Sequence, residues 1–78
     1  MSRSVADDLA AITVEEFVVS AAAGLTSLAY ARLEAKDRVQ AKQAIDALQS
    51  LLPHVAGELR GDLQQALTGL QVAFATAD

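Results

Sequence analysis

The stretch FVVSAAAGLTSLAYA, Phe17 to Ala31, lies between Glu16 and Arg32 and contains no charged side chain. Wound as an α-helix, it and the residues just after it place apolar side chains on two sides: Val18, Ala21, Leu25 and Leu28 on one, Val19, Ala22, Tyr30 and Leu33 on the other. A helix that is apolar nearly all round is usually buried all round. We therefore expect this helix to be the nearly fully buried centre of an all-α fold.

The same stretch is too short to cross a membrane. Its fifteen residues would extend about 22 Å as a helix, whereas the hydrocarbon core of a bilayer is about 30 Å thick. The residues before it include Asp7, Asp8, Glu15 and Glu16, where a signal peptide would carry basic side chains. We expect no membrane span and a cytoplasmic location.

The chain is small for a stable fold. It has 78 residues, of which 53% are hydrophobic, and a chain of this size buries only about 60% of the surface that its unfolded form exposes. Small folds are usually stabilised by disulfides, a metal or oligomerisation. Cysteine is absent, which excludes disulfides and thiolate metal sites. Oligomerisation is the remaining route, and we predict no cofactor.

The charge of the chain opposes binding to nucleic acids. Ten acidic and six basic side chains give a net charge of −4, which repels a phosphate backbone. The segment from Arg32 to Lys42 reverses this balance locally, with four basic and two acidic residues. We interpret this segment as a solvated face, and a specific anion site is the alternative.

Three helix starts share one local pattern. Thr13 with Glu16, Asp37 with Gln40, and Asp62 with Gln65 each place a capping side chain three residues before a Glu or Gln. Each pair precedes a segment with the hydrophobic period of a helix. The sequence predicts one domain, a three-helix chain of antiparallel helices over 13–34, 38–52 and 62–76. We expect 53–61 to be a connection, and 4–11 to form a short turn or to fray.

A strip of small residues separates the two apolar sides of the first helix. It consists of Ser20, Ala23, Gly24, Ser27 and Ala31. Two short partner helices cannot cover every face of an apolar helix, and small side chains let two backbones approach closely. We therefore predict that this strip is an interface with a second copy, which completes a bundle as a homodimer or a tetramer. The alternative is a monomer whose alanine-rich face tolerates water.

One group of residues has the spacing of a metal or acid–base site. If the last helix began at Pro53, His54, Glu58 and Asp62 would share one of its faces. The same spacing is typical of a solvated polar face, and Gly57 and Gly61 interrupt the helix there. We favour the solvated face and predict no metal ligand and no catalytic residue.

Three segments of the chain, in this order, resemble a known family. They are Phe17–Ala22 (FVVSAA), Ala41–Leu48 (AKQAIDAL) and Leu67–Phe74 (LTGLQVAF). They are similar to segments of the short bacterial proteins grouped as domain of unknown function eighteen-forty-four, and the resemblance covers nearly the whole chain after Thr13. It implies a small helical bacterial protein with no assigned enzymatic activity, and it transfers no catalytic residue.

These patterns predict a non-enzymatic protein that acts as a homo-oligomeric structural or protein-interaction module. Its expected partner is a second copy of the chain or another protein, and not nucleic acid. The main alternative is a small apolar-ligand carrier with a pocket inside the helical bundle near Tyr30 and Phe74. A third hypothesis is a weak metal-dependent enzyme that uses His54, Glu58 and Asp62.

Overall fold

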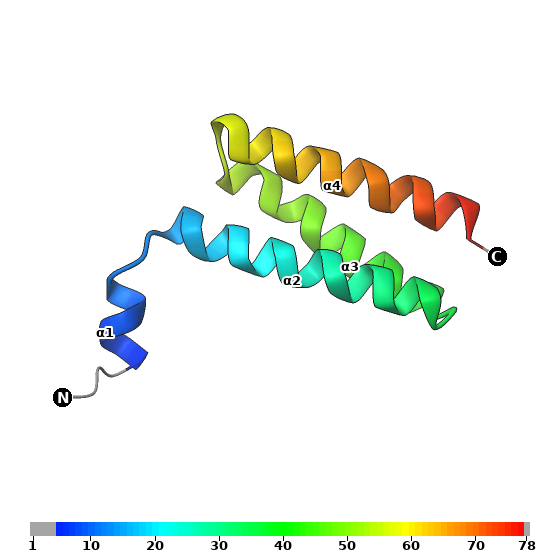
Figure 1. Ribbon diagram of the computed structural model, residues 1–78, viewed down its shortest axis with the longest axis horizontal. Coiled ribbons are helices and arrows are strands. Elements are labelled where there is room, and N and C mark those ends of the chain that lie inside the picture. Colours follow the sequence, from blue (N-terminus) through cyan, green and yellow to red (C-terminus); the bar gives the residue numbers. More distant parts are fainter. Residues whose placement is uncertain (1–4, 78) are drawn as a thin grey trace.

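The computed structural model describes residues 5–77, and within that range the chain is all-helical, as predicted. Its elements are α1 (Val5–Ala10), α2 (Val14–Glu34), α3 (Arg38–Leu51), the 3₁₀ turn η1 (Leu52–His54) and α4 (Gly57–Thr76) (Figure 1). The predicted count of three helices is wrong, because α1 forms a separate short helix where we expected a turn or a frayed segment. The three longer helices correspond to the three predicted ones.

The start of α2 is the predicted capping box. The hydroxyl of Thr13 accepts a hydrogen bond from the amide of Glu16 at 3.0 Å. In return, the amide of Thr13 donates to the Glu16 carboxylate at 3.2 Å. Two amides that have no partner inside the helix are therefore satisfied by neighbouring side chains.

The end of α2 is closed by its own backbone. The amide of Asp37 donates to the carbonyl of Arg32 at 2.9 Å, and the amide of Lys36 donates to the carbonyl of Leu33 at 3.0 Å. This pair of bonds places the residue after the C-cap in the left-handed region, and Lys36 has a φ of 61°. A side chain with a Cβ atom is strained in that conformation.

Replacing Lys36 with glycine should therefore stabilise the fold. Glycine adopts this φ without strain, and we expect a gain of about 1 kcal/mol in the free energy of unfolding, or about 4–8 °C in Tm. Thermal unfolding followed by circular dichroism measures the shift. The control is Lys36→Ala, which removes the charge and keeps the Cβ atom, so an equal gain in both variants would contradict this explanation.

Helix α3 is capped and oriented as its sequence predicts. The carboxylate of Asp37 accepts a hydrogen bond from the amide of Gln40 at 3.1 Å. The side that faces the other helices is apolar and buried, with Ala41, Ala44, Ile45 and Leu48. The opposite side carries Lys42 and Asp46, which form an exposed ion pair at 3.1 Å.

The predicted start of α4 is wrong by five residues. The helix begins at Gly57, so Asp62 lies inside it and caps nothing. The N-cap residue is Ala56, whose side chain cannot accept a hydrogen bond. Its amide instead donates to the carboxylate of Glu15, 41 positions away in the sequence, at 3.1 Å. A contact between distant segments therefore replaces the local cap that the sequence lacks at this point.

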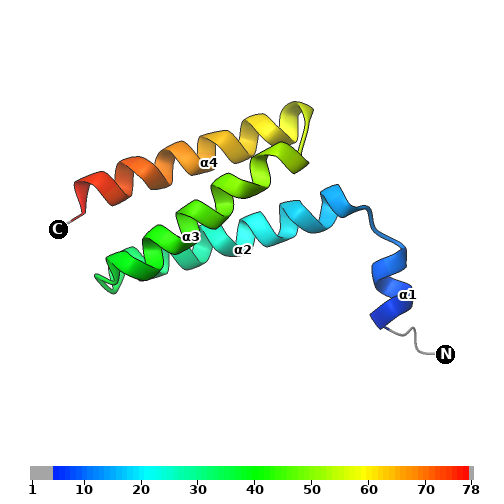
Figure 2. The same cartoon turned by 180° about the vertical axis from the view of Figure 1, so that it is seen from behind.

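The long helices pack around one apolar core. Helices α2 and α4 run in the same direction, and α3 runs in the opposite direction, from the end of α2 to the start of α4 (Figures 1 and 2). Consecutive long helices are thus antiparallel. The core is formed by aliphatic and alanine side chains: Ala22, Ala29, Ala44, Ile45, Leu48, Leu52, Val55, Leu63, Leu67 and Leu70.

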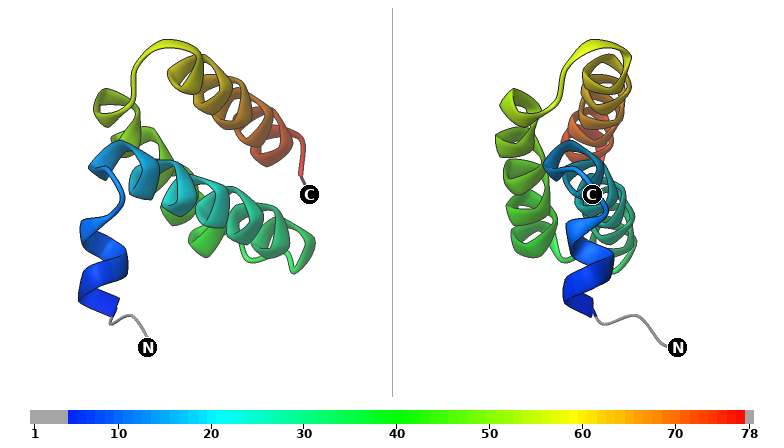
Figure 3. Two further views of the ribbon diagram at one scale, coloured as in Figure 1. Left: turned by 60° about the vertical axis from the view of Figure 1, so that its left-hand side comes forward. Right: turned by 90° about the vertical axis from the view of Figure 1, so that its left-hand side faces the viewer.

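Helix α2 is far less buried than we expected. Of its 21 residues, only Ala22 and Ala29 are buried, so the prediction of a nearly fully buried first helix is wrong for the chain on its own. The reason is the arrangement of the helices, because α3 and α4 contact α2 from one side and leave the opposite side open (Figure 3).

The molecule is elongated and exposes much surface. It measures 51 × 28 × 15 Å, with a radius of gyration of 14.5 Å, against about 11.5 Å for a compact chain of this length. Its accessible surface is 5352 Å², against about 4500 Å² expected for its mass. Part of the excess belongs to α1, which projects from the start of α2 and has no buried residue (Figure 3).

Candidate interaction surface

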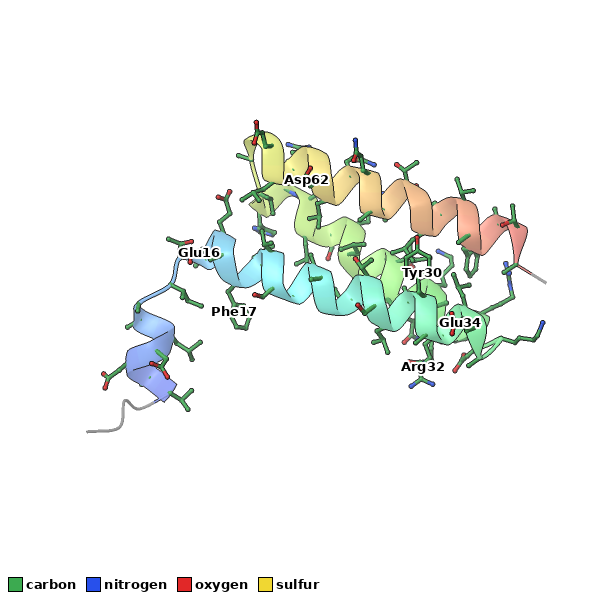
Figure 4. All side chains as sticks on the ribbon, in the orientation of Figure 1. Glu16, Phe17, Tyr30, Arg32, Glu34 and Asp62 are labelled. Atoms are coloured by element: carbon green, nitrogen blue, oxygen red, sulfur yellow. The ribbon has the colours of Figure 1, made fainter. Side chains whose placement is uncertain are left out.

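The open side of α2 carries a continuous apolar row, which we call the α2 seam. It consists of Val14, Phe17, Ala21, Gly24, Leu28 and Ala31. The large members are well exposed: Val14 by 77%, Phe17 by 54% and Leu28 by 45%. Figure 4 shows the ring of Phe17 pointing away from α3 and α4. A row of large apolar side chains in water is unfavourable, by roughly 25 cal/mol for each Å² of apolar surface that could be buried.

The spacing of the α2 seam is that of a helix–helix contact. Its members alternate at intervals of three and four residues, as in a heptad repeat, and this pattern keeps a row on one side of a helix that pairs with another helix. From Val14 to Ala31 the row extends about 25 Å along the helix axis. No member is charged. The seam thus has the period and composition of an unpaired coiled-coil face.

The structure divides the predicted small-residue strip between two surfaces. Gly24 and Ala31 belong to the α2 seam, and Ser20 and Ser27 follow along one edge of it. Ala23 instead lines a groove between α2 and α4. The other lining residues of that groove are Val19, Thr26, Leu59, Asp62, Leu63 and Ala66. All five predicted residues are exposed, and their role as an oligomer interface stays a prediction.

A second apolar surface, which sequence reasoning missed, lies where α1 meets α2. This groove, which we call the elbow, is lined by Leu9, Ile12, Thr13, Val14 and Phe17. Leu9 is 50% exposed and Ile12 is 39% exposed. The sequence contained a signal for it, because Ile12 and Phe17 stand at the positions of a hydrophobic staple around the cap Thr13. The elbow and the α2 seam share Val14 and Phe17 and are therefore continuous.

The basic segment from Arg32 to Lys42 is used in contacts within the chain. The guanidinium of Arg38 donates to the carbonyls of Phe74 and Ala77, at 3.0 and 3.2 Å, and lies 4.0 Å from the centre of the Phe74 ring. It thereby satisfies carbonyls at the C-terminal end of α4 that lack helical partners. Arg32 forms an ion pair with Asp37 at 3.4 Å. These side chains therefore support the ends of helices, and the absence of nucleic-acid binding stays a prediction.

The structure does not assemble His54, Glu58 and Asp62 on one helix. His54 belongs to η1, whereas Glu58 and Asp62 belong to α4, and Val55 and Ala56 lie between the two elements. The premise that the last helix begins at Pro53 is thus wrong. Within residues 5–77, no group of three or more His, Asp or Glu side chains could hold a metal ion.

The two rings proposed to line a ligand pocket have different neighbours. The side chain of Tyr30 points toward α4 (Figure 4), and its hydroxyl would lie 3.3 Å from a Cβ atom added at Gly69. Phe74 lies under Arg38 and lines an open groove with Val39, Lys42 and Gln43 of α3. The ligand-carrier hypothesis stays a prediction.

No family model, curated protein or solved structure matches this chain. The resemblance to domain of unknown function eighteen-forty-four therefore stays a prediction. Among the helices of residues 5–77, none combines the length and the apolar character that a membrane crossing requires.

Proposed function

We propose that this protein is a non-enzymatic, homo-oligomeric module with a structural or protein-interaction role, and that the α2 seam binds a second copy of the chain. The exposed row of Val14, Phe17 and Leu28 on the open side of α2 is the observation that carries the proposal. These side chains are 45–77% exposed. A fold of this size is only marginally stable, so leaving so much apolar surface in water is a substantial loss of stabilising burial.

The surface area of the chain supports a dimer of ordinary size. The accessible surface of 5352 Å² exceeds the value expected for a compact chain of this mass by about 850 Å². A standard protein interface buries about 800 Å² on each partner. The excess, to which α1 contributes a part, is comparable to the area that one such interface would cover.

The molar mass in solution tests the proposal. Light scattering after size exclusion should give twice the chain mass of 8.1 kDa, and dilution should shift the mass toward that of one chain as the complex dissociates. A mass of one chain that does not change with protein concentration would refute the proposal. A mass of four chains would agree with pairing through the α2 seam and would require a second interface in addition.

A further inference from the structure

We infer that the two copies pair through antiparallel α2 helices, with Phe17 of each chain packed on the partner's Leu28 and Ala21 packed on the partner's Gly24. This inference rests on the proposed dimer and adds its orientation and register. The observations behind it are the order of residues along the α2 seam, the charges at the two ends of α2 and the position of the elbow.

The α2 seam is complementary to its own reversed copy. In an antiparallel pair centred between Ala21 and Gly24, Phe17 faces the partner's Leu28 and Val14 faces the partner's Ala31. Large residues then meet near both ends of the contact, and the smallest residues meet at its centre. A Cβ atom added at Gly24 would find no heavy atom within 4 Å in the chain itself. A second backbone can therefore approach closely at this point, with Ala21 and Gly24 offering little steric resistance.

The charges at the ends of α2 favour the antiparallel orientation. The first turn carries Glu15 and Glu16, and the last turn carries Arg32 beside Glu34. A parallel pair would bring four first-turn carboxylates together and align the two helix dipoles. An antiparallel pair places Arg32 beside the partner's first turn and opposes the two dipoles head to tail. The four first-turn carboxylates are thereby separated into two pairs, one at each end of the contact.

The position of the elbow also favours the antiparallel orientation. In the antiparallel register, the last turn of the partner's α2 lies beside the first turn of this α2, where α1 and α2 form the elbow. The partner's Ala31 and Ala35 are small enough to enter a groove lined by Leu9, Ile12 and Phe17. A parallel pair would instead place two elbows side by side, so that Leu9, Ile12 and Phe17 of one chain would meet the same large side chains of the other and no small residue would enter either groove.

Disulfide cross-linking in a mixture of two single variants tests the register. The chain has no cysteine, so every disulfide comes from the introduced residues. Phe17→Cys and Leu28→Cys proteins are mixed in equal amounts, unfolded and refolded together under reducing conditions, and then mildly oxidised. Intact-mass spectrometry separates the mixed disulfide from the two self-disulfides, because the two chains differ in mass. The antiparallel pair should give mixed disulfide far above the statistical half.

The second pair of variants, Ala21→Cys and Gly24→Cys, keeps the large seam residues and should also cross-link to each other. The control is Val72→Cys on α4, an exposed position outside the seam, which should form little disulfide at the same protein concentration. A dominance of self-disulfides would establish a parallel pair, and statistical proportions would rule out the stated register. Either result overturns this inference while the dimer remains. A single-chain mass of the unaltered protein in light scattering would overturn the proposed function itself.

Discussion

Leu28→Glu should convert the proposed dimer into a monomer while the helices stay folded. The substitution places a carboxylate in the α2 seam of each chain, opposite Phe17 of the partner in the proposed pair, where pairing would remove it from water without a partner. Substitution of an interface residue that contributes strongly to binding costs about 2 kcal/mol or more, so we expect the dissociation constant to rise by at least about 30-fold. Light scattering at a concentration where the unaltered protein is dimeric measures the change.

The control for Leu28→Glu is Val72→Glu. Val72 is 59% exposed on α4, so the second variant adds the same charge to the chain outside the seam. It should leave both the molar mass and the circular dichroism spectrum unchanged. If both variants dissociated equally, net charge would be the cause and not the seam. If neither did, the α2 seam would not be the interface.

Leu48→Ala should cause a large loss of stability. Leu48 has no exposed surface and lies on the buried side of α3, within the apolar core. Replacing a buried leucine by alanine costs about 2–5 kcal/mol through lost burial and the cavity left behind. A chain of 78 residues is expected to have a total stability of roughly 4–12 kcal/mol. The variant should therefore lose a large share of its stability.

Urea unfolding followed by circular dichroism measures this loss, at one protein concentration for all variants because dimerisation adds to stability. The matched control is Gln49→Ala, which alters the next, exposed position of the same helix and should change stability by no more than about 0.5 kcal/mol. A loss below about 1 kcal/mol for Leu48→Ala would mean that this side of α3 can relax and is not a tightly packed core.

The parts of the fold that depend on neighbouring residues were predictable from the sequence. Thr13 and Asp37 cap their helices through residues three positions ahead, and Ala41, Ile45 and Leu48 repeat with the period of one helix face. These features can be recognised in the sequence because each group interacts with a residue that lies within one helical turn of it. The end of α2 at Glu34 and the start of α3 at Arg38 agree with the prediction, and the predicted first residue of α2, Thr13, is its N-cap.

The parts that depend on distant contacts were not predictable in the same way. The start of α4 is fixed in part by the carboxylate of Glu15, which reaches the amide of Ala56 from the other end of the chain. The surroundings of the small-residue strip depend on which side of α2 contacts α3 and α4. The hydrophobic pattern of a helix that is apolar on nearly every side does not show which side that is. The strip was therefore predicted as one surface, whereas Ala23 lies toward α4 and Gly24 lies in the seam.

Glu15 also links the neighbourhood of the elbow to the start of α4. Its carboxylate belongs to the first turn of α2, next to Val14 and Phe17, and holds the amide that precedes α4. One hydrogen bond thus joins the segment beside the elbow to the residue that precedes α4, which lies 41 positions further along the chain.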